Sequence, residues 1–188
     1  MTRVLEGSQD ACHDLVARYE RPMYTVILRM VRDQALAEDL CQEAFVKAFR
    51  AMGTFDRDRK LASWLFKIAH NTTLDYLRRK RLDLVPLEEP DDEAPDHRQR
   101  YQDTKVAPPD QSIEREDIAT AIEEAIADLP PHYREIVSLR YQEELPYHEI
   151  AGILEMPMGT VKTHIHRARR KLMESLEARG FSPQAVAG

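Results

Sequence analysis

Basic and hydroxyl side chains are concentrated near the end of this 188-residue chain. The segment from Lys162 to Lys171 holds five basic residues and no acidic one. On a helix, such donors reach the phosphates and base edges of a DNA major groove. The candidate contacts are Thr160, Lys162, Thr163, His164, His166, Arg167 and Arg170. This chemistry favours DNA as the ligand.

Apolar spacing indicates how these side chains are presented. Two short helices each carry an apolar face, formed by Ile150, Ala151 and Leu154 and then by Val161, Ile165, Ala168 and Leu172. We expect Pro157 to end the first helix, Gly159 to allow the turn, and the Thr160 hydroxyl to cap the second helix. The pattern predicts a helix-turn-helix. The alternative is that the basic helix is only a solvated face.

Charge is divided unevenly along a chain whose net charge is −6. Residues 1–81 carry 15 basic and 11 acidic side chains, residues 82–117 carry 4 and 12, and residues 118–188 carry 8 and 10. The middle segment is also rich in proline and poor in large apolar residues, so it cannot repay the entropy of folding. We interpret residues 82–117 as a flexible acidic linker.

Helical spacing of apolar residues recurs on both sides of this linker and strand-like alternation is absent. The sequence therefore predicts an all-α fold of two small helical domains, the second containing the helix-turn-helix. The expected boundaries are 1–81 for the first domain, 118–180 for the second and 181–188 for a tail.

Several classes of function lack their motifs. The two cysteines, Cys12 and Cys41, form no C-x-x-C pair, and we expect no metal and no cofactor. No catalytic triad or phosphate-binding glycine loop occurs, so we expect no catalytic residue. A nucleic-acid hydrolase would need a carboxylate cluster that Asp56 and Asp58 alone do not make. Without a signal sequence or an apolar run long enough to span a bilayer, the protein is expected to be cytoplasmic, with no membrane insertion.

Three motifs together resemble those of the extracytoplasmic-function sigma factors of the bacterial sigma-70 family. The segment from Asp39 to Phe45 is similar to the family's D-x-x-Q-E-x-F pattern. The run from Trp64 to Arg79 is similar to W-L-x-x-I-A-x-N-x-x-x-D-x-x-R, and Gly159 to Lys162 resembles the C-terminal pattern. The resemblance covers both folded regions, in the family's order.

The resemblance implies a role in transcription initiation. It implies that the first domain binds the beta-prime clamp helices of core RNA polymerase and the −10 element of promoter DNA. It further implies that the second domain binds the −35 element, with the beta flap and an anti-sigma factor as further partners. The implied polymerase-binding residues are Asp39, Gln42, Glu43 and Phe45. The implied −10 contacts are Arg59, Lys60, Asn71, Arg78, Arg79, Lys80 and Arg81.

A second interpretation remains open for two aromatic residues, for the linker and for the function of the whole chain. Phe45 and Trp64 fall in line with apolar neighbours, so each is also read as a core residue. The acidic linker is read either as a tether or as a segment that enters the polymerase channel. A helix-turn-helix regulator that binds duplex DNA without acting as a sigma subunit is the alternative function. It leaves the first-domain motifs unexplained.

Overall fold

The computed structural model describes residues 9–56, 58–84 and 111–181, with the side chains of 81–84 and 111–117 left aside. Helices dominate these ranges, and no strand occurs in them, which confirms the predicted all-α class. The first region comprises α2 (Gln9–Val31), α3 (Gln34–Ala51), the short η1 (Met52–Thr54) and α4 (Leu61–Leu84). The second comprises α5 (Gln111–Ala127), α6 (Pro131–Val137), the π-helical η2 (Ser138–Gln142), α7 (Tyr147–Ile153) and α8 (Met158–Ala178).

The first region is built on a tight turn between α2 and α3. Arg32 takes the left-handed conformation with φ 59°, and the Asp33 carboxylate caps α3 by accepting a hydrogen bond from the Leu36 amide. Helix α4 packs against both helices and buries Leu65 and Phe66 almost completely. The long α4 thus has one face in the core and leaves its basic C-terminal half for solvent.

The turn between α7 and α8 differs from the predicted one. Helix α8 begins at Met158, so Gly159 lies inside its first turn and Thr160 is not its cap; both expectations were wrong. Glu155 makes the change of direction instead, with φ 53°, and the Met156 amide donates to the Ala151 carbonyl. Pro157 stands at the N-cap, where its missing N–H costs nothing.

Helices extend into the predicted linker segment, residues 82–117, from both ends. Helix α4 continues to Leu84, and α5 already begins at Gln111. The remaining residues, 85–110, lie outside the described ranges, as does the expected tail from residue 182 onward. Neither reading of the linker's role is tested by the described residues.

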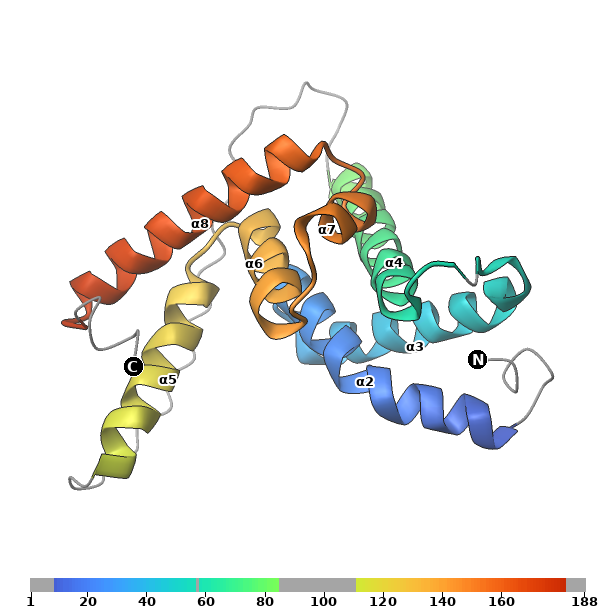
Figure 1. Cartoon of the computed structure of the whole chain (residues 1–188), viewed down its shortest axis with the longest axis horizontal. Helices are drawn as coiled ribbons and strands as arrows, with labels where there is room; N and C mark the ends of the chain where they lie inside the picture. Colours follow the sequence, from blue (N-terminus) through green and yellow to red (C-terminus); the bar gives the residue numbers. More distant parts are fainter. Residues whose placement is uncertain (1–8, 57, 85–110, 182–188) are drawn as a thin grey trace.

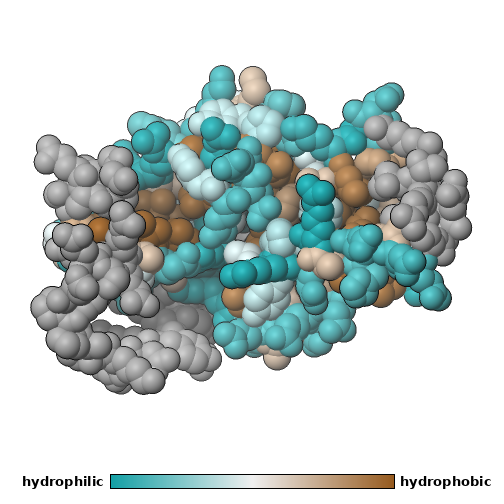
Figure 2. All heavy atoms as spheres, turned by 60° about the horizontal axis from the view of Figure 1, so that its bottom comes forward, coloured by the Kyte–Doolittle hydropathy of each residue, from teal (hydrophilic) through white to brown (hydrophobic). Residues whose placement is uncertain are grey.

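The two helical regions pack directly against each other. Helix α6 lies against α2, and α7 lies against α4, so one hydrophobic core runs through both regions. Figure 1 shows α6 and α7 between the first region, coloured blue to green, and the arms formed by α5 and α8. On the face shown in Figure 2, hydrophilic side chains cover the middle of the described surface and hydrophobic ones show toward its sides.

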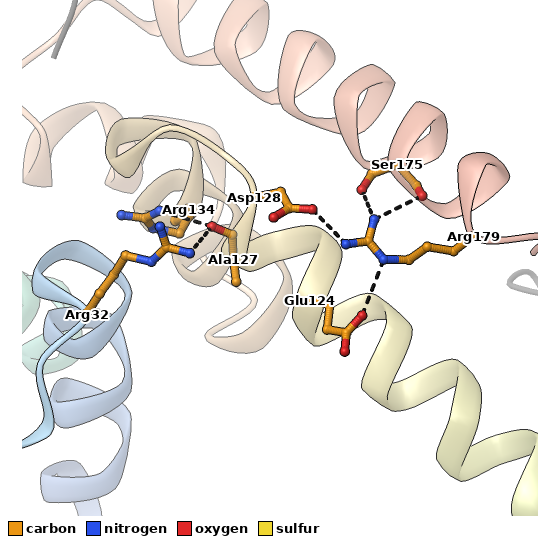
Figure 3. A network of polar contacts seen from close by, with 7 residues as sticks. All are labelled: Arg32, Glu124, Ala127, Asp128, Arg134, Ser175 and Arg179. Carbon is orange, nitrogen blue, oxygen red and sulfur yellow. Dashed lines mark hydrogen bonds and ion pairs between the residues drawn. The ribbon is translucent and has the colours of Figure 1, made fainter. Parts of the chain in front are cut away.

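Two arginines join backbone and side chains from different helices, as Figure 3 shows. Arg134 is buried and donates to the carbonyls of Arg29, Ala127 and Leu129 at 2.5, 3.2 and 2.8 Å. Burial, together with the nearby charges of other arginines, lowers the pKa of Arg134 to about 10, so it stays charged at neutral pH. Arg179 bridges α8 to α5 by binding the Asp128 and Glu124 carboxylates.

Candidate nucleic-acid interface

Helix α8 separates its apolar and basic residues onto opposite faces. Val161, Ile165 and Ala168 are buried against the rest of the second region. The exposed side chains of the opposite face are those of Lys162, Thr163, His166, Arg167 and Arg170. Because no carboxylate precedes Glu174 on this helix, the exposed face carries an undiluted positive field. Such a face suits the phosphates and base edges of a major groove.

Two of the residues expected to contact the −35 element, Thr160 and His164, are half-buried, whereas the others are exposed. His164 turns toward α6, where its ring centroid is 5.5 Å from those of both His132 and Tyr133. Its Nδ1 is buried and lacks a hydrogen-bond partner among the described residues. His164 therefore packs the first turns of α8 against α6. The other five residues are exposed, although the Thr163 hydroxyl donates to the Gly159 carbonyl and Arg170 forms an ion pair with Glu174 at 3.6 Å.

The C-terminal half of α4 presents a second polar and basic surface. Asn71, Arg78, Arg79 and Lys80 are exposed, and Arg78 lies two turns from Asn71 on the same face. The side chain of Arg81 lies outside the described set. This surface combines an amide able to contact a base with cations able to contact phosphates.

The expected contacts before α4 are already engaged in ion pairs. Arg59 pairs with Asp56 at 3.4 Å, and both side chains are well exposed. Lys60 pairs with Glu149 of α7 at 2.5 Å. The structure therefore brings one member of the expected −10 set into contact with the helix-turn-helix, which sequence reasoning did not find.

Helix α3 carries the expected polymerase-binding residues on two different faces. Asp39, Gln42 and Glu43 are exposed, whereas Phe45 is 7% exposed and stacks on Phe49 within the core. Sequence reasoning missed Val46, which is 47% exposed and lies one turn beyond Gln42 and Glu43. Helical spacing alone would have placed it beside them.

A hollow of about 440 Å³ adjoins this surface between α2 and α3. It is lined by Glu20, Arg21, Tyr24, Glu38, Cys41 and Gln42. Burial and the nearby Glu20 carboxylate raise the pKa of the Cys41 thiol to about 11. A thiol with that pKa remains protonated at neutral pH and is a poor nucleophile. Cys41 therefore fits a packing role.

The described residues contain no group of three or more histidine, cysteine, aspartate or glutamate side chains able to hold a metal ion. None of the helices described is long and apolar enough to cross a membrane.

Two family models match the chain, one in each helical region. The model of Sigma-70 region 2 matches residues 15–82, which include α3 and nearly all of α4. The model of Sigma-70 region 4 matches residues 119–172, which include the helix-turn-helix. The chain belongs to the sigma-70 family. The two matches together cover more than half of this sigma factor.

Known relatives place it in the extracytoplasmic-function group. It is 37% identical over 175 residues to the ECF RNA polymerase sigma factor SigW of Bacillus subtilis, with 93% of each chain covered. It is 34% identical over 179 residues to the RNA polymerase sigma-H factor of Pseudomonas aeruginosa, covering 93% of this chain and 91% of that one. The ECF RNA polymerase sigma-E factor of Escherichia coli K12 is 32% identical over 175 residues, with 90% and 88% covered.

Solved structures agree with the fold. CnrH, in complex with the cytosolic domain of CnrY, superposes with a TM-score of 0.62 at 24% identity, covering 94% of each chain. The sigma factor RpoE of Bartonella quintana, in complex with the anti-sigma factor NepR, superposes with a TM-score of 0.63 at 22% identity, covering 88% of this chain and 96% of that one. The chain is thus an extracytoplasmic-function sigma factor, a transcription initiation factor, and the duplex-binding regulator is not favoured.

Proposed function

We propose that this sigma factor divides promoter recognition between α8 and α4, and that α3 docks it on core RNA polymerase. The observation that carries the proposal is the segregation of α8, whose basic face is fully exposed while its apolar face is buried. The matched sigma regions supply the order of the surfaces along the chain.

At the −35 element, α8 would lie in the major groove of duplex DNA. Arg167 is the side chain best suited to a bidentate contact with guanine, and Lys162 and Arg170 suit phosphates. Thr163 donates its hydroxyl to the Gly159 carbonyl, which leaves its oxygen able to accept from a base. His164 acts from inside by supporting the helix against α6.

At the −10 element, α4 and the loop before it would hold a separated strand. Opening duplex DNA costs a few kcal/mol per unstacked step, so the protein must capture the released bases and phosphates. Asn71 is placed to contact a base. Arg59, Lys60, Arg78, Arg79, Lys80 and Arg81 supply cations for the backbone.

The polymerase contact is assigned to the exposed face of α3. Asp39, Gln42 and Glu43 form an acidic and amide edge that suits the basic side of a partner helix, and Val46 adds an apolar contact. Phe45 supports this edge from the core. The beta-prime clamp helices are the proposed partner here, and the beta flap is the proposed partner of the second region.

The remaining proposals concern a regulatory partner of this chain, its location in the cell and its lack of catalytic activity. Two of the structural neighbours are complexes, one with an anti-sigma factor and one with a cytosolic domain, so we include an anti-sigma factor among the partners of this chain. The sigma factor itself would be a non-catalytic, cytoplasmic subunit, since the polymerase supplies the chemistry of RNA synthesis.

The test is reconstitution with core RNA polymerase. The tagged chain is mixed with core enzyme, the complex is isolated, and it transcribes a library of promoter fragments. A stoichiometric complex whose transcripts share a −35 and a −10 pattern supports the proposal. A chain that binds duplex DNA but neither joins the core nor starts transcripts would refute it.

A further inference from the structure

Met158 is an exposed apolar side chain at the start of α8. It is the first residue of that helix and is 47% exposed. Among the described residues, Val46 and Tyr141 are the other large hydrophobic side chains that are exposed. Met156, two residues earlier, is half-buried and packs against the core. The exposure therefore belongs to Met158 itself and not to the whole turn.

The surroundings of Met158 leave it open to a ligand. Figure 1 shows that α8 begins beside α7 and then extends away as an arm. Gly159 carries no side chain, and apart from its chain neighbours and helix backbone no atom lies within 4 Å of where its Cβ would stand. Glu155, the last carboxylate before the helix, pairs with Lys67 of α4 at 2.9 Å. A surface can therefore approach the first turn of α8 closely.

Met158 extends the basic surface of α8 to the N-terminal end of the helix. It lies one turn before Lys162, and residues four apart are neighbours on a helix surface. Recognition helices contact base edges with residues of their N-terminal turns. Arg167 follows nine residues later, which at a rise of 1.5 Å per residue is about 13 Å along the helix, or roughly four base pairs. Met158 therefore meets a different base pair from Arg167.

Methionine differs from the neighbouring basic residues in what it can recognise. Its thioether donates no hydrogen bond and accepts one only weakly, so it gains little from a phosphate or a guanine edge. The major groove offers one apolar group, the C5-methyl group of thymine. A flexible thioether chain adapts to an irregular apolar surface of that kind. Contact would remove the methyl group and part of the exposed Met158 side chain from water.

We propose that Met158 is a specificity-determining residue of the −35 contact, and that it reads the methyl group of one thymine in the major groove. This inference rests on the proposed function, which places α8 in that groove. It adds to the basic surface a side chain that selects its base by an apolar contact. The −35 element therefore contains a thymine that is preferred for its methyl group.

The direct test removes that methyl group from the DNA and leaves base pairing unchanged. Transcription by the reconstituted polymerase first defines the −35 element, and each thymine on either strand is then replaced singly by deoxyuridine. Equilibrium binding of the polymerase complex is measured for every duplex. We expect one replacement to weaken wild-type binding about three- to five-fold, the effect of one buried methyl group.

Three variants assign the methyl effect to its side chain. Met158→Gln matches methionine in length and helix propensity but is polar, so it should bind the thymine and deoxyuridine duplexes nearly equally. Met158→Leu is the conservative control and should still prefer thymine. Tyr141→Ala removes another exposed hydrophobic side chain of the second region and should leave the preference unchanged. Circular dichroism checks that all three fold as the wild type does.

Thymines of the −10 element serve as an internal reference, because deoxyuridine there should affect the wild type and the Met158 variants alike. If no −35 position shows a methyl effect that Met158→Gln abolishes, the inference is overturned. A −35 element without thymine on either strand would overturn it as well. Normal transcription without the methyl effect refutes the contact and leaves the proposed function standing.

The proposed function can fail separately. If the complex starts no transcripts, the same scan is made on the duplex that the full-length chain selects alone. A methyl effect there that Met158→Gln abolishes would support the contact of α8 with thymine while the proposed role on the polymerase is refuted. Its absence there would overturn the inference.

Discussion

Arg167 is the side chain of α8 on which recognition of the −35 element is expected to depend most. It is exposed on the basic face, opposite the buried Ala168 and Val161 stripe. We predict that Arg167→Ala weakens initiation at −35-dependent promoters by about 1–3 kcal/mol, because a bidentate base contact is lost. Promoter-variant transcription measures the loss and the relaxed base preference.

Lys162→Ala serves as the comparison for Arg167→Ala. It should weaken binding to all sequences alike and lower the salt slope by about one, as expected for a phosphate contact. Both variants should bind core polymerase as the wild type does. Loss of polymerase binding in either variant would contradict the assignment of α8 to DNA.

His132 makes the stability of the second region depend on pH. Burial, with the nearby His164 and Arg134 charges, lowers the pKa of His132 below its usual 6.5. A lowered histidine pKa favours the neutral form in the folded state, so the contribution is full above pH 6.5 and is lost as the pH falls through the folded pKa. We predict that the stability difference between the wild type and His132→Gln shrinks from pH 7.5 to pH 5.

Chemical denaturation at several pH values tests this prediction. The second region contains other histidines, so only the difference between wild type and variant is informative. A difference that stays constant with pH would contradict the role of His132.

At the scale of elements, the sequence predicted helices better than the turn between them. Periodic apolar residues such as Leu15, Met23 and Ile27 located α2, since a helix face is a local pattern. The position of the turn was wrongly predicted from Gly159 and Thr160, because glycine is common in turns and threonine is common at helix N-caps. The structure places the left-handed position at Glu155, a residue type that carries no such signal.

Glu155 therefore offers a test of the turn itself. Its φ of 53° is left-handed, which is costly for a residue with a Cβ. We predict that Glu155→Gly is about 1 kcal/mol more stable than Glu155→Gln, because both remove the Lys67 ion pair but only glycine relieves the backbone. Urea unfolding compares the two variants. Equal stabilities would contradict backbone strain at this position.

At the scale of the whole molecule, the docking of the two regions was beyond sequence reasoning. The pairs Lys60–Glu149 and His70–Glu135 join residues far apart in the chain. Charge patterns locate such residues but do not show which partner each one finds. The same limit applies to His164, whose basic neighbours suggested DNA while its ring packs on α6.

Arg134 is the residue on which this docking depends most. We predict that Arg134→Met lowers the free energy of unfolding by about 2–4 kcal/mol, because three backbone carbonyls lose a charged donor. Hydrogen exchange at the C-terminal end of α2 should also become faster. The matched variant is Arg140→Met, whose guanidinium bonds the Leu145 carbonyl within the second region. It should destabilise that region and leave exchange in α2 unchanged, and equal acceleration would contradict the bridging role.

The contact between Arg134 and the Arg29 carbonyl spans 105 residues of chain. During synthesis the first region emerges complete while its docking partner has not yet been made. Arg134 follows Leu84, the end of α4, by 50 residues, so at about 5–20 residues per second that interval is on the order of 2.5–10 s. For that time the nascent protein presents α4 and the end of α2 uncovered, so newly made sigma factor meets its surroundings open and closes only when translation reaches α6.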